Sequence, residues 1–314
     1  MRRAVVRRLL ALIPLLLVVS FMVYSLLLLT PGDPAITLAG DNPTPEQIAE
    51  VRSQLGLDDP LIVQYGRWAA DAVRGDLGTS LYSSASVTDA IRSRLPVTLS
   101  MTGAAVFFSL IVAVPMGLLA ARRPGGVVDR LSTGVATVGI ALPSFWVGMV
   151  LIILFALRLG WFPPVGYVSF GDDPLGWARH MVLPAIALGT AAAAETTRQL
   201  RGAMLDVLDS DYVRTARSKG MRGRTVLYKH ALKNAGSPVL TVIGLQVTFL
   251  LGGSVIIEQM FAIPGLGSLA VTAVLARDIP MIQGVVLVAV VVSVVVNLLV
   301  DLAYAWLNPK VRAE

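Results

Sequence analysis

Two acidic residues inside apolar stretches are the side chains best placed for chemistry. Glu195 follows a run of small apolar residues, with Arg198 one helical turn later, and Asp301 lies four residues after Asn297. A carboxylate at a membrane-helix centre costs on the order of 2.5–3.5 kcal/mol on insertion scales and often marks a pathway or gate. An ion pair or a position at a helix end is the simpler explanation, and we favour it. Glu195, Asn297 and Asp301 remain pathway or gate candidates.

Catalytic and metal-binding patterns are missing from the sequence. The chain has no cysteine, which excludes a thiolate metal site. None of its four lysines follows a glycine, so a phosphate-binding loop of the Walker type is absent. Its two histidines, His180 and His230, are expected on opposite sides of a membrane. We therefore predict that this chain binds no metal or cofactor and is not an enzyme.

The composition is that of a membrane protein. Apolar residues make up 55% of the 314 residues and charged residues 15%, with a mean hydropathy of +0.72, whereas soluble domains are roughly a quarter charged. A membrane-crossing helix needs about 20 mostly apolar residues. Six stretches predict transmembrane helices: 9–29, 97–121, 131–157, 181–205, 237–257 and 281–304. The fourth is the least apolar, and the first is interpreted as a retained helix.

Lys and Arg are unevenly distributed between the segments that connect these helices. With the N-terminus inside, 18 of the 26 Lys and Arg residues fall in cytoplasmic segments, as the positive-inside rule predicts. Both termini are therefore expected in the cytoplasm. The net charge of +6 follows from this bias, and since the basic residues lie at helix ends we predict no nucleic-acid partner.

The chain is expected to have three parts: a first transmembrane helix (1–30), an extracytoplasmic domain (31–96) and a core of five helices (97–314). In the second part, Thr44 and Gln47 fit a helix capping box and Gly56 a helix stop. A second short helix is expected over 60–73. This region is either a solvated connector or a docking surface for an external partner.

The last external segment, 258–280, predicts a short re-entrant or interfacial helix. Glu258 ends the fifth apolar stretch, and we expect it to be solvated. Within the spans, Pro143 removes a backbone hydrogen bond and predicts a kink beside Ser144. Gly252 and Gly253 permit close helix contact or flexing. These four small or helix-breaking residues join the pathway candidates, although each also suits a purely structural helix.

The segment from Asp211 to Pro238 is the most informative part of the sequence. Nine Lys and Arg residues lie between Arg198 and Lys233, on the predicted cytoplasmic side, in a connection too long for a simple hairpin. A short helix is expected over 211–220, with Asp209, Ser210 or Asp211 as its cap and Gly220 as its stop. The alternative to partner binding is a basic helix held against anionic lipid.

This segment resembles a known family. Arg214-Thr215-Ala216, then Gly220 after three more residues, is similar to the E-A-A-x3-G signature of binding-protein-dependent ABC importer permeases, although the signature's Glu is absent. DYVRTARSKG and HALKNA resemble the variant of the peptide and nickel subfamily. Further blocks agree in order: TPGDPA (30–35), LGLDDPLIVQYGRW (55–68), LPSFWVGM (142–149), LGWFPPVGY (159–167) and FAIPGLGSLA (261–270). They cover nearly the whole chain and point to the first of two permease subunits of a dipeptide or oligopeptide importer.

The resemblance implies an all-α polytopic membrane protein with the type I ABC importer fold, six transmembrane helices and a small extracytoplasmic insertion after the first. It implies a bacterial inner-membrane location and a heterodimer with a second permease, surrounded by membrane lipid. Two ATP-binding subunits, which hold ATP and Mg²⁺, and an extracytoplasmic substrate-binding protein are the other implied partners. Relatives carry dipeptides, longer peptides, nickel chelates or glutathione, so the substrate stays open.

By the same resemblance, the cytoplasmic loop 206–236 couples the permease to the ATPases. The candidate coupling residues are Asp211, Tyr212, Arg214, Thr215, Ala216, Arg217, Lys219, Gly220, His230 and Ala231. The alternative function is a secondary transporter driven by ions or protons. Such a transporter needs ionisable residues near the membrane midplane, and the nearly uncharged spans argue against it.

Overall fold

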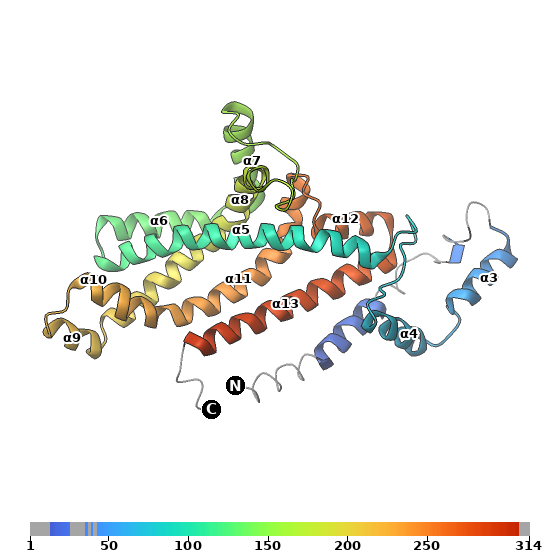
Figure 1. Ribbon diagram of the computed structural model, residues 1–314, viewed down its shortest axis with the longest axis horizontal. Helices are drawn as coiled ribbons and strands as arrows, with labels where there is room; N and C mark the ends of the chain where they lie inside the picture. Colours follow the sequence, from blue (N-terminus) through green and yellow to red (C-terminus); the bar gives the residue numbers. More distant parts are fainter. Residues whose placement is uncertain (1–12, 26–34, 37–38, 40–42, 308–314) are drawn as a thin grey trace. The chain divides into compact units, whose positions relative to one another are not determined.

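The computed structural model describes residues 13–25, 35–36, 39 and 43–307 (Figure 1). Within these ranges the regular structure is helical, apart from one antiparallel bridge between Thr79 and Ser86. The chain divides into two compact units. Unit 1 comprises residues 1–96 and 268–294, and unit 2 comprises residues 97–267 and 295–314.

The N-terminal part of unit 1 has the helices that the sequence predicts. Helix α3 (Pro45–Leu55) begins with the expected capping box between Thr44 and Gln47 and ends at Gly56, whose φ is +60°. Helix α4 (Leu61–Val73) follows. Its Tyr65 hydroxyl lies 2.8 Å from the Ser20 hydroxyl, on the helix that spans 13–25. The rest of the predicted first transmembrane helix lies outside the described residues.

A buried carboxylate joins two distant segments of unit 1. Asp278 lies between α12 (Leu266–Ala276) and α13 (Ile279–Leu307). It accepts hydrogen bonds from the Ser80 hydroxyl and, at 3.2 Å, from the Leu81 N–H. The polar turn before α5 (Val87–Arg122) is thereby fixed to the start of α13. The short helix expected in 258–280 exists as α12, and its placement in a membrane stays a prediction.

Unit 2 is a bundle built around α8 (Pro174–Leu208). Helices α6 (Val127–Ala141), α7 (Ser144–Leu151) and α11 (Leu232–Met260) pack against it. One core cluster includes Met101, Leu183, Ile257, Phe261 and Ile263, all nearly inaccessible to solvent. A second cluster joins the ends of α5, α8 and α11 through Leu118, Leu200, Met204, Ala235 and Val239.

The small residues of α8 explain how closely its neighbours approach. A methyl group added at Gly189 would lie 2.6 Å from the carbonyl oxygen of Ala105, on α5. At Gly139 of α6, the added methyl would lie 3.0 Å from the Cβ atom of Ala194. Small side chains let helix backbones approach in this way. The uncharged part of this predicted span ends at Ala194, and Glu195, Arg198 and Arg201 follow, which is why it is the least apolar of the six.

Among the described residues, three helices are long and apolar enough to cross a membrane: Val87–Arg122, Val239–Met260 and Ile279–Val300. The bent pair Val127–Ala141 and Ser144–Arg158 adds a fourth if counted as one span. Helix α8 does not meet this test of composition, and only the shorter stretch Ile13–Ser25 of the first predicted span is described. Four of the six predicted spans are thus matched by helices of suitable length and hydropathy.

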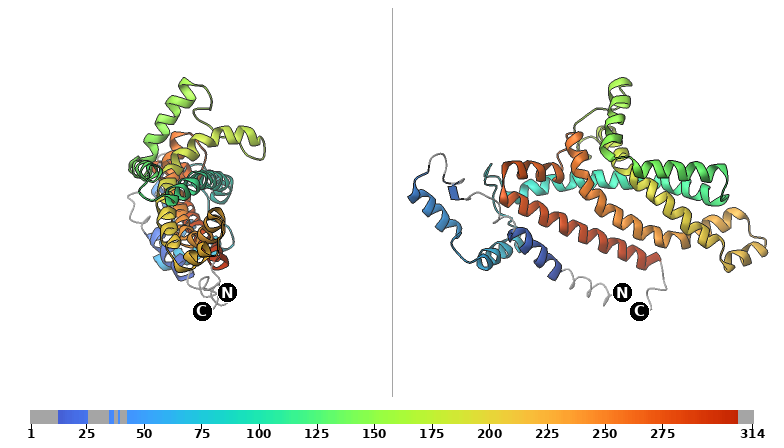
Figure 2. Two further views of the ribbon diagram at one scale, coloured as in Figure 1. Left: turned by 90° about the vertical axis from the view of Figure 1, so that its left-hand side faces the viewer. Right: turned by 180° about the vertical axis from the view of Figure 1, so that it is seen from behind.

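The third predicted span is broken rather than continuous. Its two halves meet at Leu142 and Pro143 and are bent by 101°. Proline lacks the N–H needed to continue the helix, so the predicted kink is confirmed and is larger than a simple bend. The second half passes from α7 into the π-helix η1 (Ile152–Arg158). Figures 1 and 2 show α7 and η1 projecting from the rest of unit 2.

The expectation that Glu258 is solvated was wrong. The structure buries Glu258 completely, within the last turn of α11. Its carboxylate accepts a hydrogen bond of 2.6 Å from the Thr98 hydroxyl, and the same hydroxyl oxygen accepts from the Leu266 N–H at 2.8 Å. A buried charge persists only where hydrogen bonds compensate it. Glu258 therefore holds the turn after α11 against α5.

Candidate functional site

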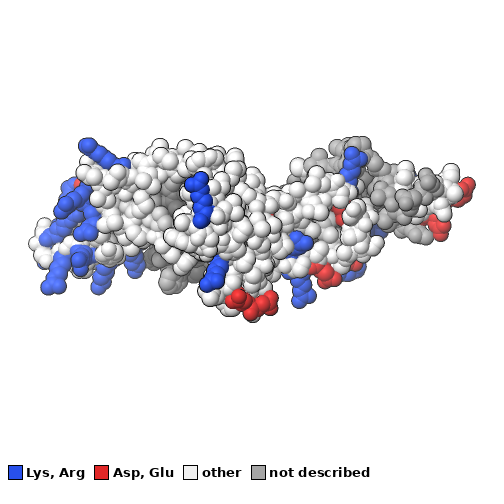
Figure 3. Space-filling model, turned by 90° about the horizontal axis from the view of Figure 1, so that it is seen from above, with Lys and Arg blue, Asp and Glu red and all other residues white. Residues whose placement is uncertain are grey.

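The predicted coupling segment forms a short exposed helix, α9 (Asp211–Ser218). Val213 is fully buried and anchors it, while most of the other α9 side chains are exposed. Figure 3 shows Lys and Arg gathered at the end of unit 2 that carries α9 and α10 (Gly223–Thr225), with few acidic residues on that face. The basic residues exposed in this segment are Arg214, Arg217, Lys219, Arg222, Arg224, Lys229 and Lys233.

Helix α9 begins where the sequence predicts, after Ser210, which is one of the three predicted caps, and it ends at Ser218, two residues before the expected stop at Gly220. Ser210 occupies the capping position, yet its hydroxyl donates to the Val207 carbonyl at 2.5 Å instead of accepting from an α9 N–H. Gly220 has φ +76°, as expected for a residue that stops a helix. The N–H of Gly220 donates to the Arg217 carbonyl at 2.9 Å.

Local contacts hold the exposed side chains of α9. The Tyr212 hydroxyl accepts from the Asn234 amide at 2.8 Å, which ties α9 to α11. Arg214 lies 3.1 Å from Asp209 and 3.5 Å from Asp211, and all three side chains are more than half exposed. Surface pairs of this kind contribute about 0–1 kcal/mol, so Arg214 can exchange them for an external partner at little cost.

The two remaining coupling candidates lie in the π-helix η2 (Val226–Ala231), which leads into α11. Ala231 is fully buried in the second core cluster, so its contribution to this end of the molecule is packing. His230 is half-buried, and its Nε2 atom is buried without a hydrogen-bond partner in the structure. Thr215 and Ala216 lie on α9, with the Thr215 hydroxyl donating to the Asp211 carbonyl at 2.9 Å.

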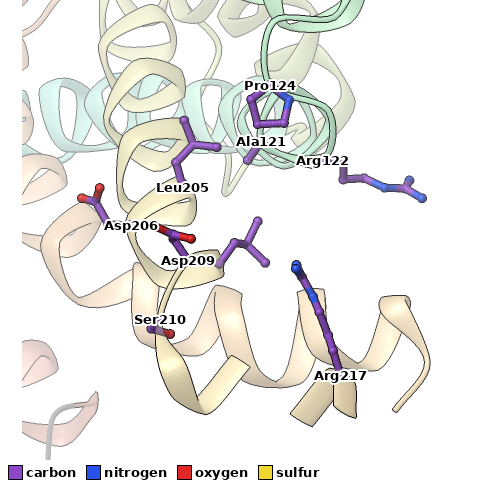
Figure 4. Close-up of a pocket in the computed structure, with 9 residues that line it drawn as sticks. Ala121, Arg122, Pro124, Leu205, Asp206, Asp209, Ser210 and Arg217 are labelled. Atoms are coloured by element: carbon purple, nitrogen blue, oxygen red, sulfur yellow. The ribbon is translucent and has the colours of Figure 1, made fainter. Parts of the chain in front are cut away.

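An open pocket of about 760 Å³ lies beside α9. It is lined by the end of α5, the last turns of α8 and Arg217 of α9. Figure 4 shows Arg217 extending from α9 toward the end of α5, where Arg122 and Pro124 lie. The pocket thus separates α9 from the turn between α5 and α6, and its walls carry both acidic and basic side chains.

A second cavity, of about 370 Å³, contains three of the pathway candidates. Ser144 of α7, Glu195 of α8 and Gly253 of α11 all line it, although they are far apart in the sequence. The other lining residues are mainly apolar: Ile140, Leu188, Ala191, Ala192, Phe249 and Leu250, with Gln246. The cavity therefore has an apolar wall with a few polar side chains.

Two polar side chains of this cavity, those of Glu195 and Gln246, have partners within unit 2. Glu195 pairs with Arg198 at 2.5 Å, the ion pair expected from the sequence, and accepts from the Gln199 amide at 3.1 Å. The Glu195 side chain is 28% exposed. Gln246 accepts from the Thr196 hydroxyl at 3.0 Å and donates to the Ala192 carbonyl at 3.2 Å. Whether Glu195 also acts as a gate stays a prediction.

The other pathway candidates lie outside this cavity wall. Pro143 immediately precedes α7, and Gly252 is exposed, with nothing within 4 Å of a methyl group added there. Asn297 donates from its amide to the Thr248 hydroxyl at 3.4 Å, between α13 and α11. The backbone of Asp301 belongs to α13, and its side chain is outside the described residues.

Sequence reasoning missed two features of this region. Val213 is the only branched aliphatic residue between Asp211 and Ser218, where the other apolar residues are Tyr212 and Ala216. A single aliphatic side chain in a polar helix was an available signal of a buried anchor. Asp129, at the start of α6, is buried and forms a two-bond ion pair with the partly exposed Arg201 of α8. No local spacing connects residues 72 positions apart, so this pair needed a structure.

Comparisons with known proteins agree with this architecture. Residues 113–313 match the family described as "Binding-protein-dependent transport system inner membrane component", and residues 1–102 match its N-terminal component. A putative peptide transport system permease protein of Brucella abortus (strain 2308) is 44% identical, over 99% of both chains. A probable peptide ABC transporter permease protein of Sinorhizobium fredii is 41% identical, over 98% of both.

Two further comparisons extend the range of relatives. The glutathione transport system permease protein of Escherichia coli (strain K12) is 43% identical, over 98% of both chains. The inward-facing MetNI methionine ABC transporter shares the fold, with a TM-score of 0.56 and 17% identity over 70% of this chain and 96% of that one. The chain thus belongs to the binding-protein-dependent transport system inner membrane component family and is a non-catalytic, multi-pass inner-membrane permease of an ABC transporter with the type I importer fold.

Proposed function

We propose that this chain forms half of the transmembrane pathway of an ATP-driven importer for dipeptides or oligopeptides. Similarity of 41–44% over almost the full length to permeases named for peptide transport is the observation that carries the proposal. The glutathione permease is similar to this chain to the same degree, so the proposed substrate class includes small peptides related to glutathione. The precise substrate depends on a binding protein that delivers it.

We propose four protein partners. A second permease completes the pathway as a heterodimer, an external substrate-binding protein delivers solute, and two ATP-binding subunits supply ATP and Mg²⁺. Helix α9 and the loop 206–236 carry the contact to the ATPases. The exposed basic face of α9, its single buried anchor and its replaceable surface ion pairs support this role.

We also propose the orientation and the three-part division. The basic end around α9 faces the cytoplasm with both termini, and residues 31–96 form an extracytoplasmic domain between the first helix and the core at 97–314. Six spans are needed for this arrangement, with α8 crossing inside the bundle. A reporter enzyme that works only outside the cytoplasm should be active when fused after Asp76 and inactive when fused after Gly223. The reverse pattern would contradict the orientation.

The direct test of the function is purification of the tagged chain from its native membranes in mild detergent. A second permease and one or two kinds of ATPase should accompany it, and the complex should hydrolyse ATP with sensitivity to vanadate. After reconstitution, uptake of a labelled dipeptide should need ATP inside and the binding protein outside. A chain that purifies alone and moves solute without ATP would instead be a secondary transporter.

The pathway candidates can be tested at two adjacent glycines. Gly253 lines the Glu195 cavity, whereas Gly252 does not. Gly253→Leu should fill part of the cavity and lower uptake by about tenfold, equivalent to about 1.4 kcal/mol, with ATP hydrolysis retained. Gly252→Leu should have the smaller effect, because a side chain there meets open space. Equal uptake by both variants would exclude this cavity from the pathway.

A further inference from the structure

The contact between α6 and α8 combines a row of small buried residues with an ion pair at one end. Asp129, Ser132, Ala136 and Gly139 are the buried residues of α6, and their spacing places them along one face of the helix. Apart from Asp129 they are small. Such a stripe allows close approach, but it offers few protruding side chains to fix how far along α8 the helix lies.

Asp129 supplies what the stripe lacks. Its carboxylate accepts from both Nε and Nη2 of Arg201, the latter at 2.8 Å, and from the Gly125 N–H at 2.8 Å. The Asp129 side chain is 5% exposed and that of Arg201 is 30% exposed. A two-bond arginine–carboxylate pair constrains direction as well as distance. The Gly125 bond extends the constraint to the turn between α5 and α6.

This anchor lies between the two candidate functional regions. Arg201 is eight residues before Asp209, where α8 ends and the chain turns into α9 through Ser210. At its other end, α6 leads through Pro143 to Ser144, which lines the Glu195 cavity. Glu195 itself belongs to α8. The same two helices therefore connect the coupling helix to two walls of the cavity.

We propose that the Asp129–Arg201 pair locks α6 to α8 in one register, so that a displacement of α9 moves both helices, and both cavity walls, as one body. Asp129 and Arg201 are positioning residues in this scheme, and they contact neither solute nor ATPase. The inference rests on the proposed function, because it assumes that α9 receives the motion of an ATPase. Without the pair, α8 would move and α6 would slip along the stripe of small residues.

The first experiment uses the complete reconstituted complex and measures uptake and ATP hydrolysis together. Asp129→Asn and Arg201→Gln should leave ATP hydrolysis nearly unchanged and lower uptake per ATP by about tenfold, within the 5–150-fold typical of a coupling between sites. Arg130→Gln removes an exposed neighbouring charge and should match the wild type. Wild-type uptake per ATP in both Asp129→Asn and Arg201→Gln would overturn the proposal.

Assembly is checked by co-purification of the partner subunits. If Asp129→Asn does not assemble, Asp129→Glu keeps the charge and moves the carboxylate by one methylene group, and it should assemble but lose uptake per ATP in the same way. Failure of the proposed function would look different. The wild-type complex itself would then show no ATP-driven uptake. If only the proposed role of the ion pair is wrong, the wild type is active and the variants have the same uptake per ATP.

The second experiment reads the lock directly. The chain has no cysteine, so spin labels can be placed at cysteines introduced for Val135 of α6 and Asp206 of α8, both exposed. The distance between the labels should be the same in nucleotide-free and ATP-bound complexes. In Asp129→Asn its distribution should broaden or shift between the two states. A wild-type distance that changes with nucleotide would overturn the proposal.

Discussion

Replacing Val213 with aspartate is expected to abolish ATP-driven uptake while leaving the chain in the membrane. Val213 is fully buried and is the one buried residue of α9. Burial of a valine side chain is worth about 1.5–3 kcal/mol, and an unpaired buried carboxylate would add a further cost. Because α9 is a short helix without a side-chain cap, the exposed Tyr212–Asn234 hydrogen bond is the main contact that would remain to hold it to α11. We therefore expect α9 to detach from the bundle.

The measurement is uptake by the reconstituted complex, with co-purification of the ATPases as a second readout. Loss of more than about 2.7 kcal/mol of stabilisation shifts the equilibrium between docked and detached α9 by at least about 100-fold. Ser218→Asp introduces the same charge on an exposed position of α9 and is the matched control, for which a change of less than about threefold is expected from typical surface substitutions. Val213→Asp with normal uptake would show that α9 does not need its anchor.

The second large effect is expected for Gly189→Ala in the centre of α8. The added methyl would lie 2.6 Å from the Ala105 carbonyl oxygen and 2.9 Å from the Phe108 ring. A backbone oxygen within a helix cannot move aside without moving α5. Overpacking in a well-packed interior typically costs about 1–3 kcal/mol, and a contact with backbone belongs at the upper end. The thermal midpoint of the purified complex should fall by several degrees.

Gly202 provides the control within the same helix. It has no atom within 4 Å of an added methyl, so Gly202→Ala changes helix propensity without changing packing. Alanine is favoured over glycine in a helix by about 1 kcal/mol, and the midpoint should stay level or rise. Equal midpoints for Gly189→Ala and Gly202→Ala would contradict the close approach of α5 and α8.

The features that the sequence predicted correctly are local ones. The capping box at Thr44, the stop at Gly56 and the break at Pro143 each follow from residues within a few positions of one another. Gly220 belongs to the same group, since a left-handed residue after a short polar helix needs only its neighbours to be recognised. The family signature added a predicted use of α9 to its position.

The features that the sequence did not predict are pairings between distant residues. Glu258 lies at the end of an apolar stretch, where solvation is the usual outcome, but Thr98 and the turn before α12 enclose it. Asp129 and Arg201 are both near predicted helix ends and look like ordinary interface charges. Only the packing of α6 on α8 brings them together. The Glu195 cavity was predicted in part. Ser144, Glu195 and Gly253 were each chosen as candidates from the sequence, but only the structure shows that they line one cavity.

The π-helix η2 has a consequence for the length of the chain between α9 and α11. A π-helix accommodates one more residue per turn than the ordinary helix around it. Each residue of an α-helix turns the chain by about 100°, so inserting one more residue into Val226–Ala231, which already holds the extra one, would rotate everything before it against α11. Leu227 and Ala231 would leave the cluster that they share with Leu200 and Met204. This stretch should accept substitutions of similar size, and the loss of its one extra residue should return it to an ordinary helical turn, but it should reject an insertion. Its maximum length is therefore a more stringent constraint than its residue types.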